Sequence, residues 1–376
     1  MKVLFSAWPG YGHLLPMMPL ARAAQRAGHQ VLVTTGPDLA DVTRGFGFEF
    51  RPTGMTAAEV YDASPSDVTV DALPPEQRVA FAARYLFGPA ALSRAIDLLD
   101  IVPAWQPDLV VHDTIELGAT IAAETFGVPH VTHGFGPMVP ETADLVTATG
   151  AFVEEADVPD PALDAFGAPY LDVTPPGLAR VTTEPWKDVR QLRPSAGEGN
   201  GDLRPALDAM PYDETVYVTL GTVPKRGSAV FRSVLEGCEP LGVNVVMTTG
   251  PGSDPESVAD GRPSLLARTY VAQASVLPYC RAVVSHAGPA TMLGALCHGL
   301  PQLCLPQGTD QPVTSAALVP TGAALELAPH EVTAEAVADS LRRLLADPSY
   351  ATNAGVLRDR IGSMPSPDLV LAEILA

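Results

Sequence analysis

The sequence lacks any apolar run of the roughly 20 residues that a helix needs to span a membrane. Its first residues, MKVLFSAWPGYGH, also lack the long apolar segment of a secretion signal, and they are typical of a strand that runs into a glycine turn. We therefore expect a cytoplasmic protein without a membrane-inserted segment.

Basic residues are scarce, because 23 Lys and Arg stand against 43 Asp and Glu and give a net charge of −20. Sequence-independent binding of nucleic acids requires a basic surface, and so does attraction to an anionic membrane, so the composition argues against both partners. A phosphorylated small molecule remains compatible with this charge, since backbone N–H groups and helix dipoles bind anions in acidic proteins.

Cysteines are also few. The four, Cys238, Cys280, Cys297 and Cys304, lie in apolar segments of the C-terminal half, and no two have the C-x-x-C spacing of a metal or redox site. We expect them to be reduced and buried, and we expect no metal site.

What the sequence does contain is an alternation of short apolar strands and helical segments, long enough at 376 residues for two domains. This pattern predicts an α/β protein with two Rossmann-like, doubly wound parallel domains that face each other across a cleft. The expected strands include Lys2–Ala7, Gln30–Thr35, Phe48–Arg51, Leu109–His112, Thr215–Leu220, Val243–Thr248 and Ala282–Ser285, and the first helix is expected at Leu14–Ala27.

The domain boundaries follow from composition. Residues 1–195 form the first predicted domain, 196–212 a linker that includes the glycine-rich end of Ser195–Asp202, and 213–362 the second domain. The C-terminal helix, 363–376, is expected to cross back to the first domain. Within the first domain, helices at Pro75–Phe87 and Pro89–Asp100, separated by Gly88, are expected to form a wall for an apolar ligand.

The segment from Ala282 to Gln311 indicates an anion site. A strand is followed by a turn of small residues, His286 to Thr291, and a helix, so backbone N–H groups and the positive helix end are exposed. A second strand, Leu303–Leu305, leads to a loop that ends in Asp310 and Gln311, whose side chains bind hydroxyl groups. Phosphate binding beside hydroxyl binding predicts a phosphorylated sugar as ligand.

His13 and Asp113 are the candidate catalytic pair. Each follows a predicted parallel strand of the first domain, so both side chains can reach the same sheet edge, while Gly10 and Gly12 allow a sharp turn before His13. A histidine at this place can act as a general base, and a carboxylate fixes its tautomer. The sequence GYGH departs from G-x-G-x-x-G because Leu15 replaces the last glycine, and no G-x-S-x-G occurs, so dinucleotide enzymes and serine hydrolases fit less well.

Together these motifs resemble family 1 glycosyltransferases of the GT-B fold, of the type found in actinomycete natural-product pathways. The resemblance covers nearly the whole chain, through GYGHLLP, PDLVVHD, LRP, VTLGT, the turn HAGPAT and, most specifically, HGLPQLCLPQGTDQ. It implies an inverting, metal-independent transfer of a sugar, a deoxysugar by the habit of this subgroup, from a nucleoside diphosphate, by the same habit dTDP, to a hydroxyl of a hydrophobic aglycone.

The same resemblance assigns residue roles. His13 matches the catalytic base and Asp113 its partner. The donor is expected to contact Gly221, Thr222, Tyr270, Val271, Gln273, His286, Gly288, Pro289, Ala290, Thr291, Asp310 and Gln311, with the Tyr270 ring on the nucleobase. The acceptor pocket is expected to comprise Trp8, Gly10, Tyr11, Gly12, Leu14, Met55, Tyr61, Phe81, Phe87, His133 and Phe135.

This chain departs from the family pattern at four positions. Ala287 and Ala290 replace glycines of the diphosphate turn, Tyr270 replaces a tryptophan and Ala272 a proline. A methyl group where the backbone approaches the ligand can tilt the diphosphate, so donor contacts are expected to differ here.

Several alternatives stay open at this point. The acceptor atom can be an aromatic carbon instead of oxygen, since the same base serves both, and UDP can replace dTDP. A sugar-nucleotide epimerase or a non-catalytic helper of a partner transferase would have the same fold. A homodimer is compatible with the sequence.

Overall fold

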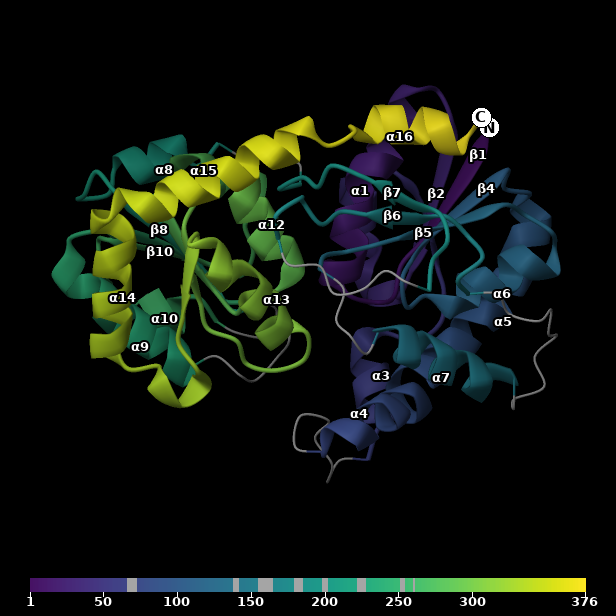
Figure 1. Cartoon of the computed structure of the whole chain (residues 1–376), viewed down its shortest axis with the longest axis horizontal. Helices are drawn as coiled ribbons and strands as arrows, with labels where there is room; N and C mark the ends of the chain where they lie inside the picture. Colours follow the sequence, from purple (N-terminus) through teal and green to yellow (C-terminus); the bar gives the residue numbers. More distant parts are fainter. Residues whose placement is uncertain are drawn as a thin grey trace. The chain divides into compact units, whose positions relative to one another are not determined.

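The computed structural model describes residues 1–65, 73–137, 142–154, 165–178, 185–197, 202–221, 228–250, 254–259 and 261–376. The chain divides into two compact units (Figure 1). Unit 1 comprises Met1–Val173, Val181–Leu192 and Pro365–Ala376, and unit 2 comprises Thr174–Arg180 and Arg193–Met364.

Unit 1 is built on a seven-stranded sheet in the order β3-β2-β1-β4-β5-β6-β7, in which every pairing is parallel. Its central strands are buried on both faces, as parallel sheets require. The strands are β1 (Lys2–Ser6), β2 (Gln30–Thr35), β3 (Glu49–Pro52), β4 (Leu109–Asp113), β5 (His130–His133), β6 (Tyr170–Asp172) and β7 (Val189–Gln191).

The helices of unit 1 cover this sheet. Leu98 and Val102 of α5 and Ala119 of α6 pack with Leu4 and Leu32 in one core cluster. The helical elements are α1 (Tyr11–Arg26), η1 (Pro37–Leu39), α2 (Ala40–Gly45), α3 (Ala57–Asp62), α4 (Pro75–Ala82), η3 (Ala83–Phe87), α5 (Gly88–Trp105), α6 (Leu117–Thr125), α7 (Thr142–Glu154) and α16 (Pro367–Ile374).

The last helix of the chain, α16, belongs to unit 1 and contacts α1. Val370 and Leu371 of α16 are buried, and Arg26 of α1 donates to the Asp368 carboxylate at 2.9 Å. The final residues therefore complete the unit that the first residues begin.

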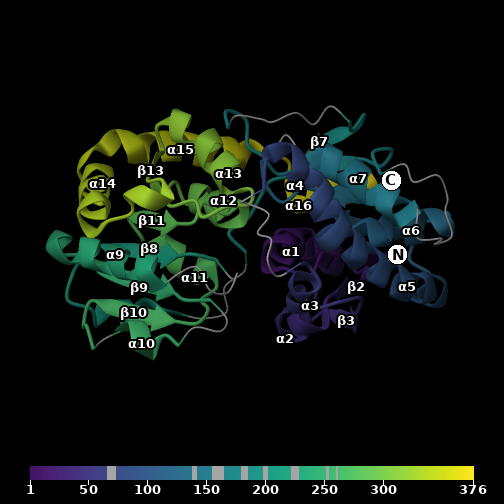
Figure 2. The ribbon, with the colours of Figure 1, turned by 90° about the horizontal axis from the view of Figure 1, so that it is seen from below.

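Unit 2 contains a six-stranded parallel sheet in the order β10-β9-β8-β11-β12-β13. Figure 2 shows α9 and α14 on one face of this sheet and α11 and α12 on the other, and the two apolar clusters of unit 2 have the same division. The strands are β8 (Thr215–Thr219), β9 (Asn244–Thr248), β10 (Leu265–Arg268), β11 (Ala282–Ser285), β12 (Gln302–Cys304) and β13 (Ala324–Glu326).

Unit 2 has longer helices at its C-terminal end, where α14 begins with Thr333 capping the N–H of Ala336 at 3.1 Å. Its helical elements are α8 (Arg204–Asp208), α9 (Ser228–Cys238), η4 (Glu239–Leu241), α10 (Glu256–Ala259), α11 (Gln273–Val276), η5 (Leu277–Tyr279), α12 (Pro289–Cys297), α13 (Gln311–Leu318), η6 (Val319–Thr321), η7 (Pro329–Glu331), α14 (Ala334–Ala346) and α15 (Pro348–Ser363). The prediction of two doubly wound parallel sheets is confirmed.

Three local expectations differ from the structure. Helix α1 begins at Tyr11 rather than Leu14, with Gly10 as its extended N-cap. Gly88 does not separate two helices: α4, η3 and α5 follow one another, and a Cβ at Gly88 would collide with the Phe152 ring. Within the expected linker 196–212, α8 places Leu207 in a core cluster of unit 2, because the segment carries apolar residues after its glycines.

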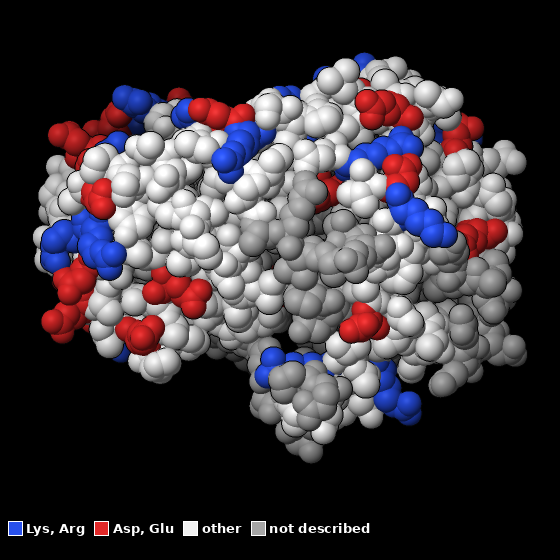
Figure 3. Space-filling model, in the orientation of Figure 1, with Lys and Arg blue, Asp and Glu red and all other residues white. Residues whose placement is uncertain are grey.

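Charged side chains of both signs lie close together on the face shown in Figure 3. Exposed ion pairs of this kind include Arg204–Asp208 at 2.8 Å and Arg281–Glu214 at 3.2 Å. Among the described residues, no helix is sufficiently long and apolar to cross a membrane.

Candidate active site

In each sheet the strand order reverses at one point, and open α/β folds bind their ligands at such a point. In unit 1 the order reverses between β1 and β4, and in unit 2 between β8 and β11, so the loops after these four strands border the switch points. His13 and Asp113 follow β1 and β4, while Gly221 and His286 follow β8 and β11. The topology therefore places these four predicted site residues at the switch points of their units.

Asp113, the last residue of β4, is fully buried and held from three sides. Its Oδ2 accepts the Trp8 N–H at 2.5 Å, its Oδ1 accepts the Ile115 N–H at 2.9 Å, and Oδ1 lies 3.4 Å from His13 Nδ1. Burial raises the pKa of Asp113, but the His13 imidazole and the two N–H donors outweigh burial, so the pKa lies below its ordinary value. Asp113 is thus an ionised partner for the imidazole.

His13 lies in the first turn of α1, and its side chain is 19% exposed. The ring centroid lies 5.3 Å from that of Trp8 and 4.6 Å from that of Phe135. A Cβ on Gly10 would lie 3.1 Å from the Trp8 ring and 3.3 Å from the His13 ring, so glycine lets both rings approach the helix start. With Nδ1 toward Asp113, Nε2 is the basic nitrogen that a ligand hydroxyl would meet.

Aromatic and aliphatic side chains surround Trp8. Its ring centroid lies 5.9 Å from Phe87 and 6.2 Å from Tyr61, and Met55 packs against the same cluster. Of the predicted acceptor contacts, Trp8, Met55, Tyr61, Phe87 and Phe135 are thus brought into one region around His13 or Trp8. Such a surface suits an apolar ligand.

Other predicted acceptor residues lie elsewhere. Leu14 of α1 is fully buried, and His133 is fully buried with Nδ1 donating to the Gly134 carbonyl at 2.6 Å. Burial lowers the pKa of His133 to about 4, so its ring is neutral. Neither side chain is exposed in this structure, and their contact with the acceptor stays a prediction. Phe81 pairs with Tyr85 at 4.8 Å, Tyr11 is half-buried, and Gly12 is exposed.

In unit 2, the His286 ring lies against two glycines. A Cβ on Gly221 would lie 2.7 Å from His286 Nε2, and a Cβ on Gly288 would be closer still. Gly221 has φ +83°, a left-handed conformation that favours glycine. Burial lowers the pKa of His286 to about 4, although a hydrogen bond of the ring to the Thr219 backbone opposes burial. The imidazole whose Nε2 lies beside the two glycines is therefore neutral.

The turn between β11 and α12 exposes the helix start. Gly288 is the N-cap and Pro289 the first helical residue, whereas Ala287 has φ +63°. Thr291, one turn into the helix, accepts a hydrogen bond from Gln273 Nε2 at 2.8 Å, which brings together two residues predicted for the donor. Tyr270 is 51% exposed, whereas Val271 and Ala290 are half-buried, and Thr222 lies outside the described residues.

The loop after β12 holds Asp310 and Gln311. Asp310 is half-buried at the N-cap of α13, and its Oδ1 accepts the Thr309 hydroxyl at 3.0 Å. Gln311 is 9% exposed, and its Oε1 accepts the Gln307 N–H at 2.7 Å. Its carbonyl oxygen therefore supports the loop.

Sequence patterns did not identify two buried charged residues behind Asp113, Arg94 and Glu116. Arg94 is the one basic residue of the apolar helix α5, a signal that could have drawn attention to it. Among the described residues, no cluster of three or more His, Cys, Asp or Glu side chains could hold a metal ion.

Comparison with known proteins gives a family. Residues 22–231 match the N-terminal domain and residues 241–376 the C-terminal domain described as erythromycin biosynthesis protein CIII-like. The L-demethylnoviosyl transferase of Streptomyces niveus is 31% identical, over 100% of this chain and 98% of that protein. The 10-deoxymethynolide desosaminyltransferase of Streptomyces venezuelae is 28% identical, over 100% and 96%.

A solved structure agrees in fold. The glycosyltransferase VinC in complex with dTDP is 24% identical and superposes with a TM-score of 0.79, covering 100% of this chain and 98% of VinC. The chain therefore belongs to the erythromycin biosynthesis protein CIII-like family and is a glycosyltransferase.

Proposed function

We propose that this enzyme transfers a deoxysugar from a dTDP-sugar to a hydroxyl of a hydrophobic natural-product aglycone, with inversion at the anomeric carbon, and with His13 as the general base. The observation that carries the proposal is the buried, ionised Asp113 at 3.4 Å from His13 Nδ1, beside an aromatic cluster. The related transferases named above transfer demethylnoviosyl and desosaminyl groups by their names, and VinC was solved with dTDP.

The base acts at the acceptor hydroxyl. An alcohol is a poor nucleophile until its proton is removed, and a positioned base contributes about 10²–10⁴ to the rate. Asp113 holds the proton on Nδ1, so Nε2 takes the hydroxyl proton, and the resulting imidazolium is stabilised by the adjacent carboxylate. The oxygen then attacks the anomeric carbon as the bond to the diphosphate breaks.

The leaving diphosphate is assigned to unit 2. The free N–H groups at the start of α12 and the positive end of its dipole favour the charge that develops on the leaving oxygen. His286, neutral at pH 7, adds a hydrogen-bond donor rather than a charge. Asp310 is assigned to the sugar hydroxyls, and the half-exposed Tyr270 ring to the nucleobase.

Turnover of a panel of dTDP- and UDP-sugars with polyketide and polyphenol aglycones, followed by mass spectrometry, tests the reaction. We expect glycosides from dTDP-deoxysugars. Products whose sugar resists acid hydrolysis would identify carbon as the acceptor atom instead. Isomerised donor without any aglycone product would identify an epimerase, and activity only after addition of a second protein would identify a helper-dependent system.

The His13→Ala variant tests the base. We expect kcat to fall by about 10²–10⁴ while dTDP binding, measured by calorimetry, stays unchanged. His330→Ala, at an exposed position of unit 2, is the matched control and should behave like the wild type. Near wild-type turnover by His13→Ala would contradict the assignment.

A further inference from the structure

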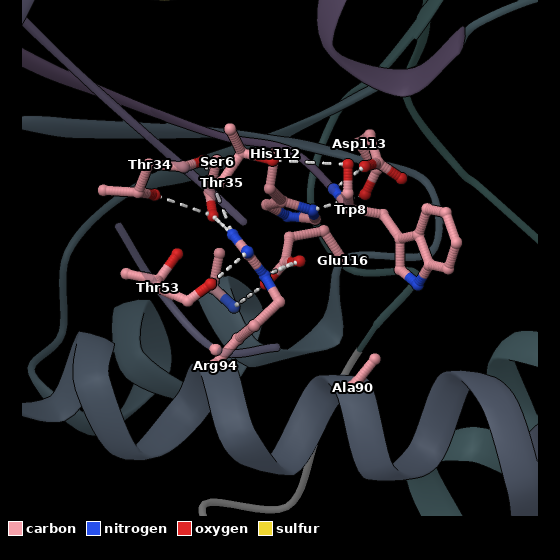
Figure 4. A network of polar contacts seen from close by, with 12 residues as sticks. Ser6, Trp8, Thr34, Thr35, Thr53, Ala90, Arg94, His112, Asp113 and Glu116 are labelled. Atoms are coloured by element: carbon pink, nitrogen blue, oxygen red, sulfur yellow. Dashed lines mark hydrogen bonds and ion pairs between the residues drawn. The ribbon is translucent and has the colours of Figure 1, made fainter. Parts of the chain in front are cut away.

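A buried arginine lies directly behind the proposed catalytic pair. Arg94 of α5 is fully buried and donates to Ser6 Oγ at 2.8 Å, to the Thr53 carbonyl at 3.0 Å and to the Thr34 carbonyl at 3.4 Å. Its Nε forms an ion pair with the carboxylate of Glu116, also buried (Figure 4). One side chain thus ties together the ends of β1, β2 and β3 and the start of α6.

The backbone leaves room for this side chain at two glycines. A Cβ on Gly54, which has φ +63°, would collide with Arg94 Cγ, and a Cβ on Gly118 would lie 2.9 Å from Arg94 Cβ. A buried ion pair gives little net stability, because desolvation of the two charges offsets their attraction. What a fully hydrogen-bonded pair does determine is the relative position of the segments that it joins.

Those segments are the ones that hold Asp113. Glu116 Oε1 caps α6 by accepting the Ala119 N–H at 3.1 Å, and the Glu116 N–H donates to the Asp113 carbonyl at 3.1 Å. The same turn contains Ile115, whose N–H binds Asp113 Oδ1. Ser6, on the other side, lies two residues before Trp8, whose N–H binds Asp113 Oδ2.

We propose that Arg94 and Glu116 are positioning residues: they hold the two N–H donors that orient the Asp113 carboxylate, and through Asp113 they hold His13 in its reactive geometry. The proposal rests on the proposed function of His13 as the base. Neither residue touches the substrate. Their effect reaches the reaction only through the backbone on both sides of Asp113.

The charge on Glu116 is sensitive to pH. Burial raises the pKa of Glu116 to about 7, although Arg94 opposes burial, and the nearby Asp113 raises it further. The charged groups that act on Glu116 are Arg94 on α5 and Asp113 on β4, while β1 and β2 contribute the neutral Ser6 and Thr34 to this network. Glu116 therefore titrates near neutral pH beside the catalytic pair.

Glu116→Gln is the sharpest test, because the amide oxygen can still cap α6 while the charge and its titration are lost. We expect kcat to fall about ten- to a hundredfold with KM for the donor unchanged, since small misplacements of catalytic groups cost rates of this order. The pH profile of kcat should also change shape. Glu49→Gln, which removes an exposed partner of Arg51, is the matched control and should leave both unchanged.

A measurement without substrate separates this proposal from the proposed function. Nitrogen-15 NMR of labelled histidine, assigned with His13→Ala, reports whether His13 Nδ1 carries the proton that faces Asp113. We expect this signal in the wild type and its loss or broadening in Glu116→Gln. Failure of the wild type to turn over any donor would refute the proposed function, whereas the NMR comparison would still decide the role of Glu116.

The double variant Arg94→Met/Glu116→Met removes both charges and covers the case in which Glu116→Gln fails to fold, because apolar replacement of a buried pair is often tolerated. We expect it to fold and to show the same loss of kcat. The positioning role is overturned if either folded variant retains wild-type kcat, pH profile and His13 signal.

Discussion

Ala287 stores backbone strain in the turn between β11 and α12, and Ala287→Gly should release it. At φ +63° an L-residue lies in the left-handed region, which costs roughly 1–2 kcal/mol. Ala287 is fully buried, so removing its methyl group loses about 0.8 kcal/mol of burial. Glycine also adds roughly 0.4–1 kcal/mol of unfolded-state entropy. These contributions nearly cancel, so stability should stay within about 1 kcal/mol of the wild type.

Ala295→Gly provides the matched control. Ala295 is equally buried but lies in the right-handed interior of α12, where glycine relieves no strain. It should lose about 2 kcal/mol, from the methyl group and the helix propensity of glycine. Urea unfolding followed by circular dichroism measures both variants. Equal losses of unfolding free energy in the two variants would refute the claim that the turn is strained.

Three further predictions concern stability. Burial lowers the pKa of His112 to about 3 and that of His133 to about 4, below the ordinary 6.5. The stability that these neutral rings contribute is therefore complete above pH 6.5 and is lost as the pH falls. At pH 5 the two histidines together should lower the free energy of unfolding by about 4 kcal/mol. The raised pKa of Glu116 acts in the opposite sense and offsets about 2 kcal/mol of this loss between pH 7 and pH 5. Glu116→Gln should therefore lose stability more steeply than the wild type when urea unfolding at pH 7 and at pH 5 is compared. Gly88→Ala should lower the free energy of unfolding by about 1–3 kcal/mol, because the new methyl group overpacks against the Phe152 ring. Adding Phe152→Leu should recover part of this loss. If the losses of the two single variants simply add in the double variant, the two side chains do not interact.

The proximity of His13 and Asp113 was predictable from the sequence, because the carboxyl ends of neighbouring parallel strands meet at one sheet edge. The turn at His286 was predictable for a related reason, since a strand, small residues and a proline define a helix start locally. Both inferences need only local patterns and the rules of parallel sheets.

What the sequence did not reveal depends on contacts between distant segments. Arg94 bonds to residues 41 and 88 positions away, and no local pattern identifies such partners. Leu14 was assigned to the acceptor by the resemblance, and only the packing of the helices shows that this side chain is fully buried. Gly88 was interpreted as a helix break, although its role is to admit a ring from α7, which only packing shows.

The position of α16 has a consequence for how the chain folds during synthesis. Most of unit 1 is synthesised before unit 2, but Val370 and Leu371, the side chains that α16 buries in unit 1, are made after unit 2. All of unit 2 is synthesised in between, and its sheet is complete by β13. Unit 2 can therefore finish folding while the face of α1 that receives α16 is still uncovered, and unit 1 is completed after unit 2.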